Sequence, residues 1–104
     1  MEIISIDDLH DKFEELGEND LILDVRSPGE FQSGHIKGAR NQDHETVTQI
    51  ADELKGHSTV YVHCKMGGRA KMASETLENS GLTNIVCVGN GGMERWSQMG
   101  WPIE

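Results

Sequence analysis

The chain has few positive charges, few cysteines and no long apolar run among its 104 residues. Its nine lysines and arginines are outnumbered by 18 aspartates and glutamates, so the net charge is −9. Nucleic acids and anionic membranes favour positively charged partners, and this balance therefore argues against both. No stretch approaches the roughly 18 apolar residues of a membrane-spanning helix, and no basic start followed by an apolar stretch suggests a signal peptide. We therefore expect a cytoplasmic protein with neither nucleic acid nor membrane as partner.

Cysteine is also scarce, because Cys64 and Cys87 are the only two. Without a secretory signal they are not expected to form a structural disulfide, and two cysteines without a close second pair do not indicate a zinc site. The scattered His10, His44 and His57 show no ligand spacing, so we predict neither a metal nor a cofactor. Cys87 lies in an apolar run, Ile-Val-Cys-Val, and is interpreted as a small core residue.

What the chain does contain is an alternation of apolar runs and helical patterns. Continuous apolar runs are typical of buried parallel strands, whereas apolar residues at i, i+3, i+4 and i+7 are typical of helices. Strands are predicted at residues 3–4, 21–25, 59–63 and 84–88, with a short extended piece around Ala39. Helices are predicted between Ser5 and Gly17, after Ser27, over residues 43–54, between Ala70 and Gly81, and between Gly92 and Gly100. This order predicts a single α/β domain over residues 1–104 with a mostly parallel sheet.

The segment VYVHCKMGGR, from Val60 to Arg69, is the strongest functional signal. A β-branched run ends at Cys64, two glycines follow, and a helical pattern begins at Ala70. Glycine permits the backbone conformations that turn successive N–H groups inward, and the helix N-terminus adds a partial positive charge. Such a cradle favours a thiolate, so we predict Cys64 as a nucleophile.

Charge and loop length limit which substrates the site could bind. Lys65, Arg69 and Lys71 lie close together without an acid among them, and a positive patch in an acidic chain favours a small anionic substrate. A solvated helix start would carry the same charges. Four residues separate Cys64 from Arg69. Cysteine phosphatases have a longer loop, so this smaller bowl suits one sulfur atom on the cysteine better than a tetrahedral oxyanion.

Four motifs in order then resemble one family. The segment Cys64-Lys65-Met66-Gly67-Gly68-Arg69 matches the Cys-x-x-Gly-x-Arg loop of single-domain rhodaneses, the thiosulfate and persulfide sulfurtransferases. The other three are Asp24-Val25-Arg26 with Glu30-Phe31, the segment GHIKGARN from Gly34 to Asn41, and Gly91-Gly92-Met93 with Trp96 and the closing Gly100-Trp101-Pro102. The resemblance to the rhodanese family covers nearly the whole chain.

The resemblance implies a central parallel sheet of about five strands wrapped by helices, and a double-displacement reaction without a cofactor. Cys64 would take a sulfane sulfur from thiosulfate or a persulfide donor and pass it to a thiol or cyanide acceptor. The implied substrate-binding residues are those of the loop, Lys65, Met66, Gly67, Gly68 and Arg69. Asp24 and Arg26 end another predicted strand, so they are expected near the site if the two strands are neighbours.

Two alternatives stay open. One is a sulfur-relay module that docks a partner protein, with thiosulfate turnover incidental. The other is a cysteine-based phosphatase or arsenate reductase, which the short loop disfavours.

Three further expectations concern residues outside the loop. Arg26 and Glu30 are close enough in sequence to form an ion pair that ties a strand end to the next helix. His63 is expected to pack, or to hydrogen-bond to the backbone, rather than to act as a base. One residue more than the family's usual spacing lies before the paired glycines, and Gly89-Asn90 is expected to absorb it in a loop.

Overall fold

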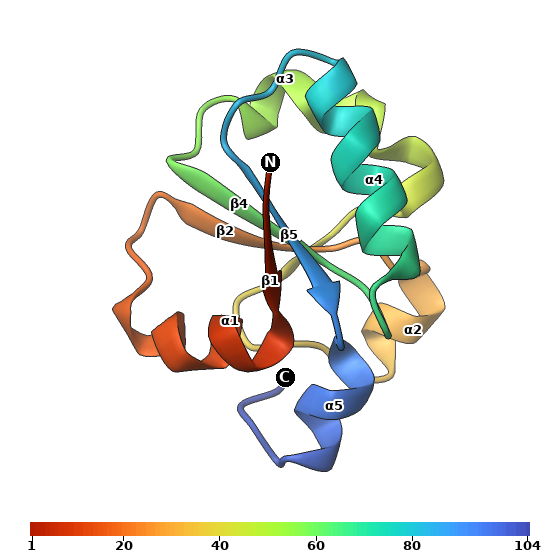
Figure 1. Ribbon diagram of the computed structural model, residues 1–104. Coiled ribbons are helices and arrows are strands. Elements are labelled where there is room, and N and C mark those ends of the chain that lie inside the picture. Colours follow the sequence, from red (N-terminus) through yellow and green to blue (C-terminus); the bar gives the residue numbers. More distant parts are fainter.

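A computed structural model describes residues 1–104 and contains one five-stranded sheet in the order β1-β5-β4-β2-β3 (Figure 1). All neighbouring strands are parallel. The strands are β1 Glu2–Ser5, β2 Asp20–Asp24, β3 Arg40–Asn41, β4 Thr59–His63 and β5 Ile85–Asn90. The α-helices are α1 Ile6–Lys12, α2 Pro28–Gln32, α3 Ala51–Leu54, α4 Gly68–Asn79 and α5 Met93–Gln98, and the 3₁₀ helices are η1 Phe13–Glu15 and η2 His44–Ile50. The predicted α/β class and parallel five-stranded sheet are confirmed.

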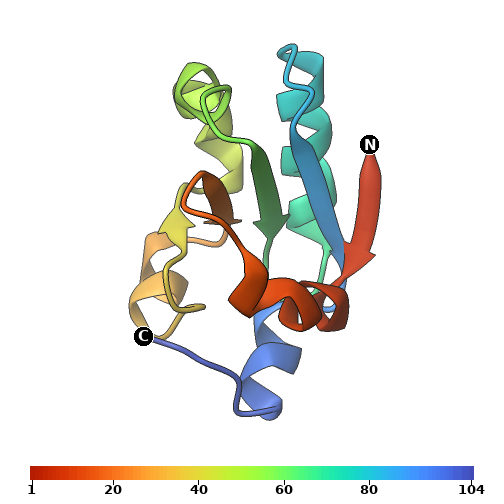
Figure 2. The ribbon, with the colours of Figure 1, turned by 90° about the vertical axis from the view of Figure 1, so that its left-hand side faces the viewer.

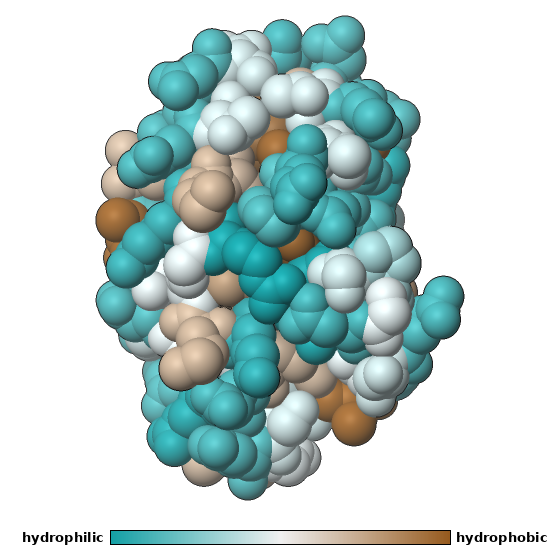
Figure 3. Space-filling model, turned by 90° about the vertical axis from the view of Figure 1, so that its right-hand side faces the viewer, coloured by the Kyte–Doolittle hydropathy of each residue, from teal (hydrophilic) through white to brown (hydrophobic).

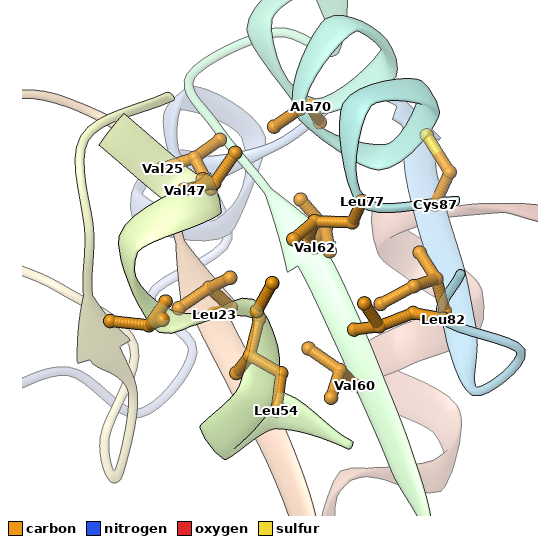
Figure 4. Packing of buried hydrophobic residues seen from close by; sticks show 14 of the residues in the cluster. Leu23, Val25, Val47, Leu54, Val60, Val62, Ala70, Leu77, Leu82 and Cys87 are labelled. Carbon is orange, nitrogen blue, oxygen red and sulfur yellow. The ribbon is translucent and has the colours of Figure 1, made fainter. Parts of the chain in front are cut away.

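The sheet is buried on both faces, which explains its continuous apolar runs. Alternate residues point to opposite sides: Leu23 joins the core cluster under α3 and α4, whereas Ile22 joins the cluster under α1 and α5. Figure 4 shows the first cluster, in which Val62 of β4 lies near Leu77 of α4 and Val60 lies near Leu54 of α3. The helices α2 and α5 lie beyond the carboxyl ends of the strands in both Figure 1 and Figure 2. No helix combines the length and the apolar content needed to cross a bilayer.

Local sequence determines where two helices begin. Ser5 precedes α1, and its hydroxyl accepts from the Asp8 N–H (3.0 Å) while the Asp8 carboxylate accepts from the Ser5 N–H (3.0 Å). Ser27 and Glu30 form the same reciprocal pair at the start of α2, where Pro28 is the first helical residue. Both arrangements satisfy N–H groups that a helix start otherwise leaves unpaired, and both predicted helix starts are confirmed.

The helix predicted over residues 43–54 forms mostly as the 3₁₀ helix η2, followed by the short α3. The side-chain Nε2 of Gln42 donates to the Thr46 carbonyl (3.1 Å) and to the Thr46 hydroxyl (2.8 Å). This contact joins Gln42 to the first turn of η2. The apolar face was still predicted correctly, because Val47, Ile50 and Leu54 are all buried.

Strand β5 is longer than predicted, and Gly89-Asn90 lies within it. Ile4 of β1 is opposite Val88 and Ser5 is opposite Asn90, so Gly89 is skipped in the register. The extra residue is therefore absorbed as a β-bulge in the sheet, not in a loop as expected. A side chain at Gly89 would crowd Ile3 of β1, at 3.0 Å from its methyl carbon.

Candidate active site

The sulfur of Cys64 lies where β4 ends and is almost fully buried, with 1% of the residue exposed. The N–H of Gly67 donates to Sγ at 3.1 Å, and the N–H of Ala70, in the first turn of α4, donates at 3.3 Å. Two inward donors at the start of a 12-residue helix favour negative charge on sulfur. The structure thus brings the predicted nucleophile into a cradle, with Ala70 as a donor beyond the loop residues that were predicted.

Gly67 is required by both its conformation and its surroundings. Its φ of +124° lies in the region that side chains rarely adopt, and a Cβ there would collide with the carbonyl oxygen of Gly89. The bulge in β5 therefore supports the loop from behind. Gly68 has no such need, because nothing lies within 4 Å of the position its Cβ would take.

The outer side of the loop is attached to α5. The N–H of Met93 donates to the Cys64 carbonyl (2.9 Å), and the N–H of Glu94 donates to the Lys65 carbonyl (3.2 Å). A Cβ at Gly92 would collide with the Cys64 oxygen and lie 2.6 Å from the Lys65 oxygen. This close approach is the physical reason for the second glycine of the Gly91-Gly92 motif, which sequence reasoning treated only as a family signature.

Arg69 is held by Glu30 of α2. Nη1 donates to Oε1 at 2.6 Å and Nη2 donates to Oε2 at 3.0 Å, across 39 positions of sequence. The Arg69 hydrogen bonds lower the pKa of the Glu30 carboxyl from 4.5 to about 2. The expected ion pair between Arg26 and Glu30 is therefore wrong: α2 docks against the loop, and this places Glu30 opposite Arg69.

Arg26 pairs with Asp24 instead. Its Nε donates to Asp24 Oδ1 (3.0 Å), and its Nη2 donates to Asp24 Oδ2 (2.8 Å) and to the Gly34 carbonyl (2.8 Å). The Asn41 amide donates to the carbonyls of Asp24 and Arg26, at 3.0 and 2.9 Å. These contacts join the Asp-Val-Arg motif to the segment that ends at Asn41 and fix the geometry beside the loop.

His63 lies behind the loop, fully buried. Its Nδ1 is 3.3 Å from the Cys64 carbonyl, which can only accept, so Nδ1 carries the proton. Burial lowers the pKa of the imidazole, although the Asp24 carboxylate opposes this. The predicted backbone hydrogen bond is confirmed. Cys87 is also fully buried, and burial raises the pKa of its thiol, in agreement with a packing role.

An open pocket of about 480 Å³ adjoins the loop between α2 and α5. Lys65 lines it at the beginning of the loop, and Glu30, the partner of Arg69, lines it near the loop's end. The side chain of Met66 is not part of this pocket, and 65% of the residue is exposed. Figure 3 shows the side of the molecule that carries α2 and α4: its surface is mostly hydrophilic, with hydrophobic residues in small separate patches.

Comparison with known proteins agrees with this geometry. The model of the family described as Rhodanese-like domain matches residues 5–99. The thiosulfate sulfurtransferase GlpE of Vibrio cholerae is 30% identical over 83 residues, which are 80% of this chain and 77% of that protein. The uncharacterized protein YqhL of Bacillus subtilis is 37% identical over 75 residues, or 72% of this chain, and the match spans only 59% of YqhL.

A solved structure has a similar fold. A rhodanese-like domain from Anabaena superposes with a TM-score of 0.85 at 25% identity, covering 100% of this chain and 79% of that one. The family model spans most of the chain and includes the cysteine loop, the Asp24-Val25-Arg26 segment and the paired glycines. The chain therefore belongs to the rhodanese-like domain family.

Proposed function

We propose that this chain is a sulfurtransferase that carries a sulfane sulfur on Cys64 as a persulfide. The observation that supports this most directly is the pair of N–H donors, from Gly67 and Ala70, that face the buried sulfur. The same donors would stabilise the thiolate before transfer and the persulfide after it. Thiosulfate or a persulfide is the proposed donor, and a thiol or cyanide is the proposed acceptor.

In the first half-reaction, the Cys64 thiolate attacks the outer sulfur of thiosulfate. The bond between the two sulfur atoms of thiosulfate breaks, and sulfite leaves with the electron pair. In the second half-reaction, the acceptor attacks the outer sulfur of the Cys64 persulfide. The new S–S bond breaks, Sγ leaves as a thiolate, and the resting enzyme is restored.

The loop residues have different roles in this proposal. Lys65 and Lys71 form no ion pair within the protein, so they are the groups that attract a dianionic donor. Arg69 is neutralised by Glu30 and holds the loop in place. Gly67 and Gly68 supply backbone that surrounds the bound sulfur. Met66 lies on the exposed outer side of the loop.

The relay module is a second candidate, and one observation favours it. Met66 of the loop and Met72 of α4 are 65% and 60% exposed, and methionine is common on adaptable docking surfaces. In that case a protein thiol would be the physiological acceptor. The chemistry at Cys64 would be the same.

The test is an intact mass measured before thiosulfate, after thiosulfate, and after cyanide. We expect a gain of one sulfur atom and then its loss. The gain should be absent in Cys64→Ser and retained in Cys87→Ala, a matched variant that keeps the core position apolar. A sulfur atom that still attaches to folded Cys64→Ser would refute the assignment. Faster turnover of an aryl phosphate than of thiosulfate by the unmodified chain would instead favour phosphatase chemistry.

A further inference from the structure

The pocket between α2 and α5 contains a buried charged group that the proposed half-reactions do not use. Arg26 lines this pocket, although 94% of the residue is hidden from solvent. Its Nε and Nη2 are occupied by Asp24 and by the Gly34 carbonyl. Its Nη1 forms no hydrogen bond and is not among the polar atoms sealed from solvent without a partner. One guanidinium nitrogen with free donors therefore faces the pocket.

The unpaired cation on the pocket wall is Lys65, because Arg26 is already paired with Asp24. Lys65 forms no ion pair, and it follows the nucleophile directly in the chain. Of the two acids on the pocket wall, only one keeps an uncompensated negative charge: Glu30 is neutralised by Arg69, whereas Glu94 of α5 has no partner. Fixed donors from Arg26 beside a mobile ammonium from Lys65 make a site that suits a carboxylate.

The pocket is large enough to hold a molecule bigger than the sulfur donor. Thiosulfate has five heavy atoms and needs roughly 150 Å³ at about 30 Å³ per water-sized group. The pocket volume of about 480 Å³ leaves room for a larger molecule. Its lining includes Lys65, which follows Cys64 in the chain, and Glu30, which pairs with Arg69, so the pocket adjoins the loop that carries Cys64.

We propose that this pocket is the acceptor subsite, and that it selects a low-molecular-mass thiol carrying a carboxylate group. The inference rests on the proposed function and specifies its second substrate. Arg26 Nη1 and Lys65 Nζ bind the carboxylate and direct the thiolate toward the Cys64 persulfide. The acceptor thiolate attacks the outer sulfur, the bond from that sulfur to Sγ breaks, and the products are an acceptor persulfide and the Cys64 thiolate.

The experiment uses protein already loaded with one sulfur atom, as verified by intact mass. Its discharge is then followed with three thiols that share the same linker between sulfur and terminal group: 3-mercaptopropionate, mercaptoethanol and cysteamine, which end in a carboxylate, a hydroxyl and an ammonium. Rates are compared at equal thiolate concentration. The net charge of −9 should by itself disfavour the anionic thiol. We expect mercaptopropionate to be about tenfold faster than mercaptoethanol, as for one charge-assisted contact, and this advantage should shrink at high salt.

Two charge variants should move the mercaptopropionate-to-mercaptoethanol rate ratio in opposite directions. Lys65→Gln should lower the ratio severalfold, and Glu94→Gln should raise it, because the unpaired acid repels the carboxylate. Lys37→Gln removes an exposed lysine outside the pocket and serves as the matched control. Arg26→Lys should also lower the ratio if circular dichroism shows it to be folded.

The outcomes separate the two proposals. The acceptor-subsite proposal is overturned if the protein loads sulfur but shows no preference for mercaptopropionate. It is also overturned if Lys65→Gln and Lys37→Gln change the mercaptopropionate-to-mercaptoethanol rate ratio equally. In both cases the sulfurtransferase proposal remains intact. Failure to load any sulfur overturns the proposed function and this inference with it. Loading followed by the expected preference, with opposite responses to Lys65→Gln and Glu94→Gln, supports both.

Discussion

Replacing Glu30 by glutamine would remove the charge that joins α2 to the nucleophile loop. Glutamine still suits the third position of a helix that begins after Ser27, so the start of α2 should be retained. The substitution therefore tests the contact with Arg69 more selectively than alanine would. We expect Glu30→Gln to destabilise the fold and to slow sulfur transfer, because the loop end loses its anchor.

The size of the effect follows from the Glu30 carboxyl. Lowering its pKa from 4.5 to about 2 corresponds to roughly 3 kcal/mol. This is an upper bound, because the Glu30 and Arg69 side chains are 33% and 30% exposed and solvent screens the pair. We therefore expect a loss of about 1–2 kcal/mol at neutral pH, or roughly 5–10 °C in Tm for a domain of about this size.

The pH dependence has a definite sign. A carboxyl whose folded pKa is depressed contributes stability that is present above its unfolded pKa and is lost as the pH falls through the folded pKa. The difference between the unmodified chain and Glu30→Gln should thus be full at pH 7 and shrink as the pH falls from about 4.5 toward about 2.

Urea unfolding at several pH values measures this difference directly. Glu18→Gln is the matched control, because Glu18 is exposed and forms no ion pair. If Glu30→Gln and Glu18→Gln have the same stability at pH 7, the Arg69 contact contributes nothing. If the difference is unchanged at low pH, its origin is not the carboxylate.

Three other predictions follow from the contacts around the loop. Gly92→Ala should cost about 2–3 kcal/mol and reduce sulfur transfer, because the added carbon meets two loop carbonyls. Gly29→Ala is its control, because a Cβ at Gly29 would meet nothing within 4 Å, and it should be neutral or stabilising by up to about 1 kcal/mol. Equal losses of stability in Gly92→Ala and Gly29→Ala would contradict the steric argument. Asp24→Asn should cost about 3–5 kcal/mol in urea unfolding because it leaves Arg26 buried without its counter-charge, whereas a loss below about 1 kcal/mol would show that Arg26 finds another partner. Salt should raise the apparent KM for thiosulfate more than it changes kcat, because Lys65 acts through an exposed charge. A KM that does not change with salt concentration would show that Lys65 does not attract the donor.

Some features could be predicted from the sequence because they depend on neighbours along the chain. The helix starts after Ser5 and Ser27 depend on side chains three residues apart. The strands could be recognised as continuous apolar runs, because both faces of a parallel sheet are covered. The position of Cys64 between a strand and a glycine loop is also a local property, so the N–H cradle around its sulfur could be anticipated.

The cradle itself was predicted only in part, since its second donor, Ala70, belongs to the helix and not to the loop. The charge patch was predicted too broadly for a related reason. Arg69 was counted as free, whereas Glu30 neutralises it. Sequence spacing favoured Arg26 as the partner of Glu30, because distance along the chain is a guide to contact only within one element.

The sequence by itself thus determined the elements, their order and the position of the cysteine that we propose as the nucleophile, since each follows from patterns a few residues long. Only the tertiary structure decided which elements meet at the loop. Glu30 reaches Arg69 because α2 docks beside the loop. Two further contacts support the loop: the Gly89 carbonyl packs against Gly67, and the first N–H groups of α5 donate to the carbonyls of Cys64 and Lys65. These contacts depend on the strand order β5-β4-β2 and on the docking of helices over it, which packing across the whole core selects.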